Sequence, residues 1–141
     1  MGAKVAFCWT PKLARFIPWL AFRDYHRETL KAFGADGYIV VNFTNDTLQL
    51  SSEEGKYTAE EIKDVSGLAG RGLLVACRPN SGCPLPMFEH PEDCMYVFGP
   101  DCGDVDVIMP GNMELQIPTP VSYSLWSPVA SGIILHDRSC N

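Results

Sequence analysis

The chain has 141 residues, of which 46% are hydrophobic and 20% charged, and its formal net charge is −6. This length and apolar content suffice for one domain with its own core, which we expect to span residues 1–141. The excess of acidic residues argues against non-specific binding to nucleic acid, because contacts with phosphates need clustered Lys and Arg. No apolar run approaches the roughly 18 residues that cross a bilayer, so we expect a soluble, cytoplasmic protein.

The first third of the chain predicts a strand, a helix and a second strand. "KVAFCW" (residues 4–9) is a short apolar run typical of a buried strand. Apolar and charged residues interleave from Pro18 to Phe33, and Gly34 follows as a stop signal, which predicts a helix. "GYIVVNF" (residues 37–43) is again typical of a strand. A strand, a helix and a strand imply a right-handed crossover in a parallel sheet.

The middle of the chain continues this alternation. "TAEEIKDVSGLAG" (residues 58–70) predicts a second helix, because Thr58 and Glu61 have the spacing of a capping box. "GLLVAC" (residues 72–77) and "CMYVFG" (residues 94–99) predict two further buried strands, separated by a proline-rich connection. The fold class predicted from these elements is α/β, with a parallel sheet flanked by helices.

Six cysteines are spread through apolar segments, without a C-x-x-C pair. We expect most of them to be reduced, with Cys8 and Cys77 acting as small hydrophobic residues in strands. The nearest approach to a metal-binding cluster consists of Cys83, His90, Cys94 and Cys102. Its spacing fits no zinc pattern, so we expect no metal site.

The loop sequences exclude two common nucleotide-binding motifs. A dinucleotide-binding fold needs G-x-G-x-x-G after the first strand, but that turn reads "WTPKLARFIP" and contains no glycine. A Walker A loop is also absent from the sequence. Ligands of open parallel sheets bind beyond the carboxyl ends of the strands, and Gly99 lies at such an end.

Three sharp chain reversals near the C-terminus indicate a ligand site. Gly99 permits close approach of a backbone, and Pro100 fixes the turn after it. Pro118 ends a strand, and Ser127 with Pro128 supplies an N-cap and a first helical residue for "PVASGIILH". Each reversal alone is better explained as a plain turn between core elements. The three together, in this order, favour a site.

The segments "YVFGPDCGDV", "LQIPTP" and "YSLWSPVASGIILHDR" resemble the second and third motifs of the SPOUT superfamily, in particular its SpoU-type RNA ribose methyltransferases. In that family one strand ends in Phe-Gly before an acidic residue, a later strand ends in Ile-Pro, and Ser-Leu-Asn opens the last helix. "FGADGYIVV" resembles an earlier part of the same family. The resemblance implies a C-terminal deep trefoil knot, S-adenosylmethionine as cofactor, and a homodimer. The cofactor-binding residues it implies are Phe98, Gly99, Ile117, Pro118, Ser124 and Leu125.

The sequence departs from the family where the acceptor is bound. The family's first motif carries an asparagine and an arginine. The arginine position is held here by Glu28, with Arg27 one residue too early, and the asparagine has no clear counterpart. Asp101 replaces the usual glutamate of the second motif, and Trp126 replaces the asparagine of the third. The candidate catalytic residues are therefore Arg23, Arg27, Glu28, Asp101 and Ser124.

The candidates on the predicted helix, and Trp126, each have a possible role and an alternative. Arg23 or Arg27 would anchor phosphate or orient the attacking hydroxyl, work that Glu28 cannot do. Glu28 could instead act as a base if burial raised its pKa. Such a run of basic residues is more often a solvated helix face than a binding patch; here it consists of Lys12, Arg15, Arg23, Arg27 and Lys31. Trp126 would stack on a base or close the adenosine pocket, or else lie at a dimer interface.

Two functions from different classes follow from the resemblance. The first is an S-adenosylmethionine-dependent RNA methyltransferase, acting on a ribose 2′-hydroxyl of tRNA or rRNA. The second is a non-catalytic dimer of the same fold that binds the cofactor or a partner without methylating. The dimer would be built on the first and last helices, with Trp19, Phe22 and Trp126 as interface candidates.

Overall fold

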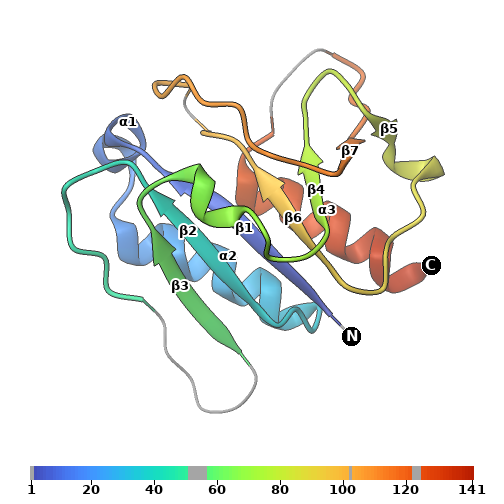
Figure 1. Ribbon diagram of the computed structural model, residues 1–141, viewed down its shortest axis with the longest axis horizontal. Coiled ribbons are helices and arrows are strands. Elements are labelled where there is room, and N and C mark those ends of the chain that lie inside the picture. The colour runs from blue at the N-terminus through green and yellow to red at the C-terminus, as the bar shows by residue number, and fades with distance from the viewer. Residues whose placement is uncertain (1, 51–56, 102, 122–124) are drawn as a thin grey trace.

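A parallel sheet forms the centre of the molecule (Figure 1). The computed structural model describes residues 2–50, 57–101, 103–121 and 125–141, and within them seven strands are ordered β3-β2-β1-β6-β4-β7-β5. The strands are β1 (Ala3–Trp9), β2 (Gly37–Asn42), β3 (Thr58–Ile62), β4 (Leu74–Cys77), β5 (Cys83–Pro84), β6 (Cys94–Phe98) and β7 (Met113–Gln116). All the paired neighbours run parallel. The predicted α/β class with a parallel sheet is confirmed.

The described residues form three α-helices and two 3₁₀ turns. They are α1 (Pro11–Phe16), α2 (Trp19–Ala32), α3 (Ser127–Cys140) and two 3₁₀ turns, η1 (Val65–Leu68) and η2 (Leu85–Met87). Among the described residues, none of the helices is long and apolar enough to cross a membrane.

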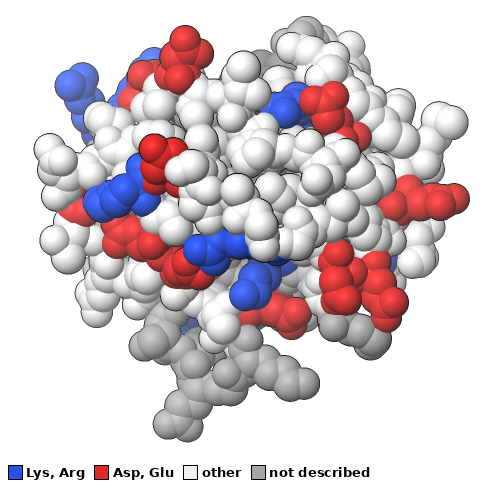
Figure 2. Space-filling model, viewed as in Figure 1, with Lys and Arg blue, Asp and Glu red and all other residues white. Residues whose placement is uncertain are grey.

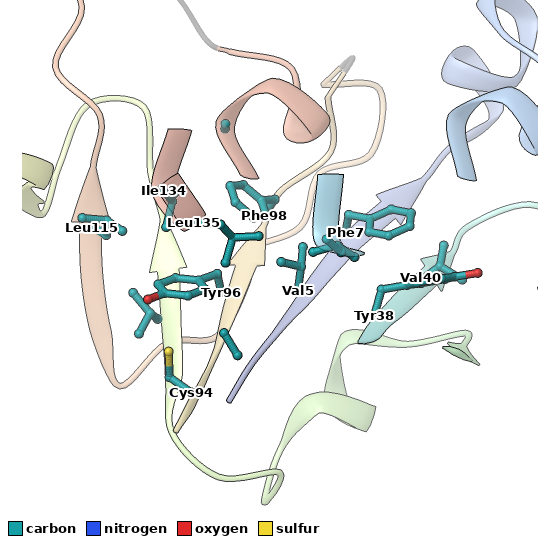
Figure 3. Packing of buried hydrophobic residues seen from close by; sticks show 14 of the residues in the cluster. Val5, Phe7, Tyr38, Val40, Cys94, Tyr96, Phe98, Leu115, Ile134 and Leu135 are labelled. Atoms are coloured by element: carbon teal, nitrogen blue, oxygen red, sulfur yellow. The ribbon is translucent and has the colours of Figure 1, made fainter. Parts of the chain in front are cut away.

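The α2 and α3 helices cover one face of the sheet and enclose the larger core cluster. Phe22 and Leu30 of α2 and Ile134 of α3 are fully buried there. Figure 3 shows side chains of β1, β2, β6 and β7 meeting those of α3 in this layer. The imidazole of His26 stacks on the ring of Phe7, with centroids 3.8 Å apart and planes 4° apart.

The opposite face of the sheet is covered by η1 and by the loop after β6. Leu68 of η1 and Met109 of the loop are buried against strand residues such as Ala6, Ile39 and Val97. The central strands are therefore buried on both faces, which explains their nearly continuous apolar sequences. It also places the β6–β7 loop in contact with the core.

The helix predicted for residues 58–70 is wrong. Thr58–Ile62 forms the edge strand β3, which pairs in parallel with Gly37–Val41 of β2. Glu61 does not cap a helix, because its carboxylate accepts a hydrogen bond from Asn42 Nδ2 at 2.7 Å. Glycines at positions 67, 70 and 72 disfavour a longer helix, and only the 3₁₀ turn η1 forms in this segment. Pairing with β2 therefore outweighs a local capping pattern.

Two helix starts also differ from the sequence prediction. The segment read as a plain turn contains α1, which Thr10 caps by accepting a hydrogen bond from Leu13 N, with Pro11 as the first helical residue. Ser127 is not an N-cap but the first residue of α3, and its N–H donates to Asp101 Oδ1 at 2.8 Å. The cap of α3 thus comes from a distant part of the chain.

The aromatic residues expected at a dimer interface lie in three different environments. Phe22 is completely buried in the core, so its expected exposure is wrong. Trp19 is half-buried and donates from Nε1 to Gln49 O at 2.9 Å. Trp126 is 36% exposed and packs against Phe22 and Tyr25. Of the three, only Trp126 is exposed.

Candidate functional site

A pocket of about 250 Å³ lies where the carboxyl ends of β4, β6 and β7 meet. Three segments far apart in the sequence form its walls. They contribute Cys77, Arg78 and Pro79 after β4; Phe98, Gly99, Pro100, Asp101, Val107 and Met109 after β6; and Leu115, Ile117, Leu125 and Ala130 from the last part of the chain. This edge is where open parallel sheets bind ligands, because strand-end loops leave backbone groups accessible there.

Gly99 leaves open space in the pocket wall. A Cβ atom added to Gly99 would meet only Met109 Cγ, at 3.9 Å. Gly99 is not among the glycines with positive φ, so its backbone does not itself require glycine. By contrast, a Cβ on Gly111 would lie 2.5 Å from Ala76 Cβ, which identifies Gly111 as a packing glycine. The space next to Gly99 is available to a ligand.

The pocket has one basic and one acidic residue among its described lining. The basic residue is Arg78, which follows the end of β4. Its Nε donates to Glu114 Oε2 at 2.5 Å and its Nη2 donates to Met109 O at 2.9 Å. These bonds tie the guanidinium to β7 and to the β6–β7 loop, so its position is fixed by both.

The acidic residue, Asp101, begins a chain of hydrogen bonds that crosses from the pocket to α2. Its Oδ1 accepts from Ser127 N at 2.8 Å, and its Oδ2 accepts from Ser127 Oγ at 2.7 Å. Ser127 Oγ also lies 3.0 Å from His26 Nε2. Because the Ser127 hydroxyl gives its one proton to Asp101, His26 Nε2 must be the donor to Ser127 Oγ. The chain connects α2, α3 and the loop after β6.

Burial sets the protonation of both ends of this chain. Burial raises the pKa of Asp101 to about 6, although the two hydrogen bonds from Ser127 oppose that shift. Burial lowers the pKa of His26 to about 3, so its imidazole is neutral at neutral pH. Asp101 is therefore ionised at pH 7 but close to its titration range. Burial also raises the pKa of the Cys77 thiol, which makes it a poor nucleophile.

The structure brings together part of the predicted cofactor site. Phe98, Gly99, Ile117 and Leu125 line the pocket together with Asp101. Pro118 directly follows Ile117 but is not among the described residues that line the pocket. Ser124, predicted as a cofactor and catalytic residue, lies outside the described residues, as does Cys102. No group of three His, Cys, Asp or Glu side chains in the described part of the chain could hold a metal ion.

The predicted acceptor-binding residues lie on α2, outside the lining of this pocket. Arg23 donates from Nη1 to Gln49 O at 3.1 Å and forms an ion pair with Asp24 at 3.0 Å. Arg27 Nη1 lies 4.0 Å from the same Asp24 carboxylate. Glu28 lines a separate groove between α2 and α3. Neither arginine occupies the site that the cofactor residues form within this chain.

The groove between α2 and α3 has a volume of about 1130 Å³ and a largely apolar lining. Its exposed apolar side chains are Tyr25, Phe33, Trp126, Val129 and Ile133. An exposed apolar groove of this kind is typical of surfaces that contact another molecule.

Two residues of the site, Arg78 and His26, are not among the residues predicted from the sequence. Arg78 was part of a connection read only for its prolines, although a charged residue directly after a buried parallel strand is a usable signal. His26 lies within the helix predicted from Pro18 to Phe33, and no sequence motif marks it. Its link to Ser127 spans 101 positions, so local pattern could not reveal it.

No protein-family model and no curated protein matches the sequence, whereas solved structures match the fold. The A. aeolicus TrmH/SpoU tRNA modifying enzyme is 17% identical with a TM-score of 0.66, covering 99% of this chain and 74% of that one. The SpoU methyltransferase AviRb from Streptomyces viridochromogenes, in complex with the cofactor AdoMet, is 16% identical with a TM-score of 0.64, covering 97% and 56%. An RNA 2′-O ribose methyltransferase is 15% identical with a TM-score of 0.67, covering 96% and 54%.

The chain therefore has the fold of TrmH/SpoU-type RNA methyltransferases. It spans only 54% to 58% of the length of five of the similar structures. At identities of 15% to 19%, this similarity concerns the fold and not the chemistry.

Proposed function

We propose that this protein is an S-adenosylmethionine-dependent RNA methyltransferase that acts on a ribose 2′-hydroxyl. The observation that carries the proposal is the pocket at the ends of β4, β6 and β7, in a fold otherwise found in enzymes of this class. Four residues assigned to the cofactor from sequence motifs line that pocket: Phe98, Gly99, Ile117 and Leu125.

The lining of the pocket fits S-adenosylmethionine. Ile117 and Leu125 offer apolar walls for the adenine ring, and the free space next to Gly99 lets a ligand reach the backbone. The opposite charges of Arg78 and Asp101 complement a ligand that carries both a carboxylate and cationic groups. When bound, S-adenosylmethionine supplies a methyl group on a positively charged sulfur.

Asp101 is the best-placed proton acceptor in the pocket. Its two oxygens are oriented by Ser127, and each retains a lone pair for a further contact. A pKa of about 6 leaves the carboxylate ionised at pH 7 while keeping it basic enough to take a proton from an attacking hydroxyl. We therefore assign to Asp101 the removal of the proton from the acceptor hydroxyl.

A specific observation favours the second candidate function, a dimer of the same fold that binds S-adenosylmethionine without methylating. Arg23 is engaged by Asp24 and Gln49, and the described pocket lining contains neither Arg23 nor Arg27. On the face seen in Figure 2, Lys and Arg lie interspersed with Asp and Glu, without a continuous basic area for RNA. Binding of the cofactor is thus better supported than binding of RNA.

We propose that the protein is a homodimer that buries the groove between α2 and α3. The groove is apolar and open, and Trp126 at its end is half covered by Phe22 and Tyr25 of its own chain.

The trefoil knot stays a prediction. It is supported by the close contact between the loop after β6 and the start of α3, through Asp101 and Ser127.

The decisive first experiment is isothermal titration calorimetry with S-adenosylmethionine and S-adenosylhomocysteine. Both should bind at micromolar to millimolar concentration, and failure of both would refute the methyltransferase and leave only a dimer that binds another partner. Transfer of tritiated methyl to bulk tRNA and rRNA then separates the enzyme from the non-catalytic dimer. Replacing Arg23 or Arg27 by Ala should remove transfer while changing cofactor affinity only a few-fold, if either arginine holds the acceptor.

A further inference from the structure

Arg78 is placed to contact an anionic group inside the pocket. It follows the last residue of β4, and its own backbone N–H donates to Leu115 O of β7 at 2.8 Å, which fixes the start of the side chain. Glu114 and the Met109 carbonyl hold Nε and Nη2. Among the described residues, Nη1 has no hydrogen-bond acceptor, although it carries two donors. The guanidinium is therefore anchored through Nε and Nη2, while Nη1 retains donors for a ligand.

An anchored guanidinium is a selective binding group. Because the protein already restricts its rotamers, little further conformational entropy is lost when a ligand binds. The planar fork matches a carboxylate, which can accept two parallel hydrogen bonds. The Arg78 side chain is 26% exposed, so it is accessible from the pocket while partly shielded from water.

The second charge of the pocket restricts the class of ligand further. Asp101 belongs to the same lining, and its carboxylate would repel a ligand that carried only negative charge. A ligand with one carboxylate and nearby positive charge satisfies both side chains. The methionine part of S-adenosylmethionine has this pattern, with a carboxylate, an ammonium group and a sulfonium.

We propose that Arg78 binds the carboxylate of the methionine part of the cofactor, and that this contact fixes which end of the cofactor lies at the end of β4. The inference rests on the proposed function, since it requires that S-adenosylmethionine occupies the pocket. Arg78 then binds the carboxylate of the ligand, and Asp101 faces its cationic part.

The test is a double-mutant cycle between the protein and its ligand, measured by calorimetry at one ionic strength. The ligands are S-adenosylmethionine and decarboxylated S-adenosylmethionine, which lacks only the carboxylate. Replacing Arg78 by Met preserves much of the aliphatic side chain and removes the charge. We expect Arg78→Met to weaken binding of S-adenosylmethionine about tenfold or more, and binding of the decarboxylated ligand less than twofold. Arg78→Lys should recover only part of the loss, because an ammonium cannot form the paired contact.

Arg71→Met is the matched control, because Arg71 forms a similar partly exposed pair with Glu60 away from this pocket. It should change neither affinity. Equal losses of both ligands in Arg78→Met would mean that Arg78 only holds the pocket walls, and unchanged affinities would mean that it contacts something else; either result overturns the proposal. If the unmodified protein binds neither ligand, the proposed function itself fails and this inference fails with it. Thermal unfolding of Arg78→Met confirms that the variant is folded.

Discussion

Two opposing effects act on the carboxyl group of Asp101. Asp101 caps the first N–H group of α3, which favours its ionised form through the helix dipole and two hydrogen bonds. Its burial has the larger effect and raises its pKa. A carboxyl group held in this balance is suited to proton transfer, because it is charged at neutral pH yet remains basic.

The first prediction concerns Gly99→Val. The added side chain would meet little of the protein besides Met109, so the fold should tolerate it with a change in Tm of a few degrees. The branched side chain would instead occupy the open part of the pocket. Calorimetry should then detect no binding of S-adenosylmethionine. Normal binding by a folded Gly99→Val protein would show that the segment after β6 is only a turn.

The second prediction concerns the pH dependence of stability at Asp101. Its pKa in the folded protein is about 6, against 3.8 for an ordinary aspartate, so the folded state keeps this proton longer than the unfolded state. The contribution of Asp101 to stability is therefore fully present below pH 3.8 and is lost as the pH rises through 6. From pH 4 to pH 7 the loss amounts to roughly 2 kcal/mol, because each pKa unit corresponds to about 1.4 kcal/mol and the unfolded-state carboxyl is already partly ionised at pH 4.

The Asp101→Asn variant should not show this loss of stability between pH 4 and pH 7. Urea unfolding at several pH values, compared between the variant and the unmodified protein, isolates the effect because all other titrating groups are shared. Asp104 and Glu60 have lowered pKa values, so they make the protein more stable as the pH rises. Both proteins contain them, so their effect cancels when the free energies of unfolding are subtracted. A difference that stays constant between pH 4 and pH 7 would contradict the raised pKa of Asp101.

At the scale of elements, α2, α3 and the loop after β6 are joined by Ser127. The third prediction is that Ser127→Ala destabilises the protein by about 1–3 kcal/mol, because it leaves buried His26 Nε2 and Asp101 Oδ2 without their partner. It should also raise the pKa of Asp101 further, since the Ser127 side chain lowers it. Unfolding by denaturant measures the first effect, and titration of the Asp101 carboxyl by NMR measures the second.

Ser131→Ala is the control for this prediction. Ser131 is equally buried on α3, but its hydroxyl donates only to the Ser127 carbonyl one turn earlier, at 2.6 Å. Removal of the Ser131 hydroxyl should therefore lower the free energy of unfolding less than Ser127→Ala does, and should leave the pKa of Asp101 unchanged. If the two variants have the same effect on Asp101, the hydrogen-bond chain does not connect α2 to the pocket.

The elements also differ in how far the sequence predicts them. The buried strands β1, β2, β4 and β6 are predictable, because parallel strands covered on both faces need continuous apolar runs. The edge strand β3 is not, because "TAEEI" is polar and is stabilised by pairing with β2. The turns at Gly99 and Pro118 are also predictable from local chemistry. Arg78 and His26 are not, because the reversals that bring them to Asp101 and Ser127 depend on the whole topology.

At the scale of the whole molecule, the sheet and the helices divide the protein into two surfaces with different roles. The carboxyl ends of the strands form the pocket that contains Arg78 and Asp101. The α2 and α3 helices form an exposed apolar groove between them. The chain from Asp101 through Ser127 to His26 runs between these two surfaces. Association through the groove would therefore act on helices that also hold the pocket.

The last prediction is that association depends on this groove. In sedimentation at micromolar concentration, the protein should have about twice the monomer mass of 15.6 kDa. Val129→Glu places a charge at a residue that is 50% exposed in the groove, so it should yield monomers without unfolding the chain. Leu20→Glu is the control, because Leu20 is 48% exposed on α2 but does not line the groove. Monomers of the unmodified protein, or equal dissociation by both variants, would mean that a different surface or no surface joins two chains.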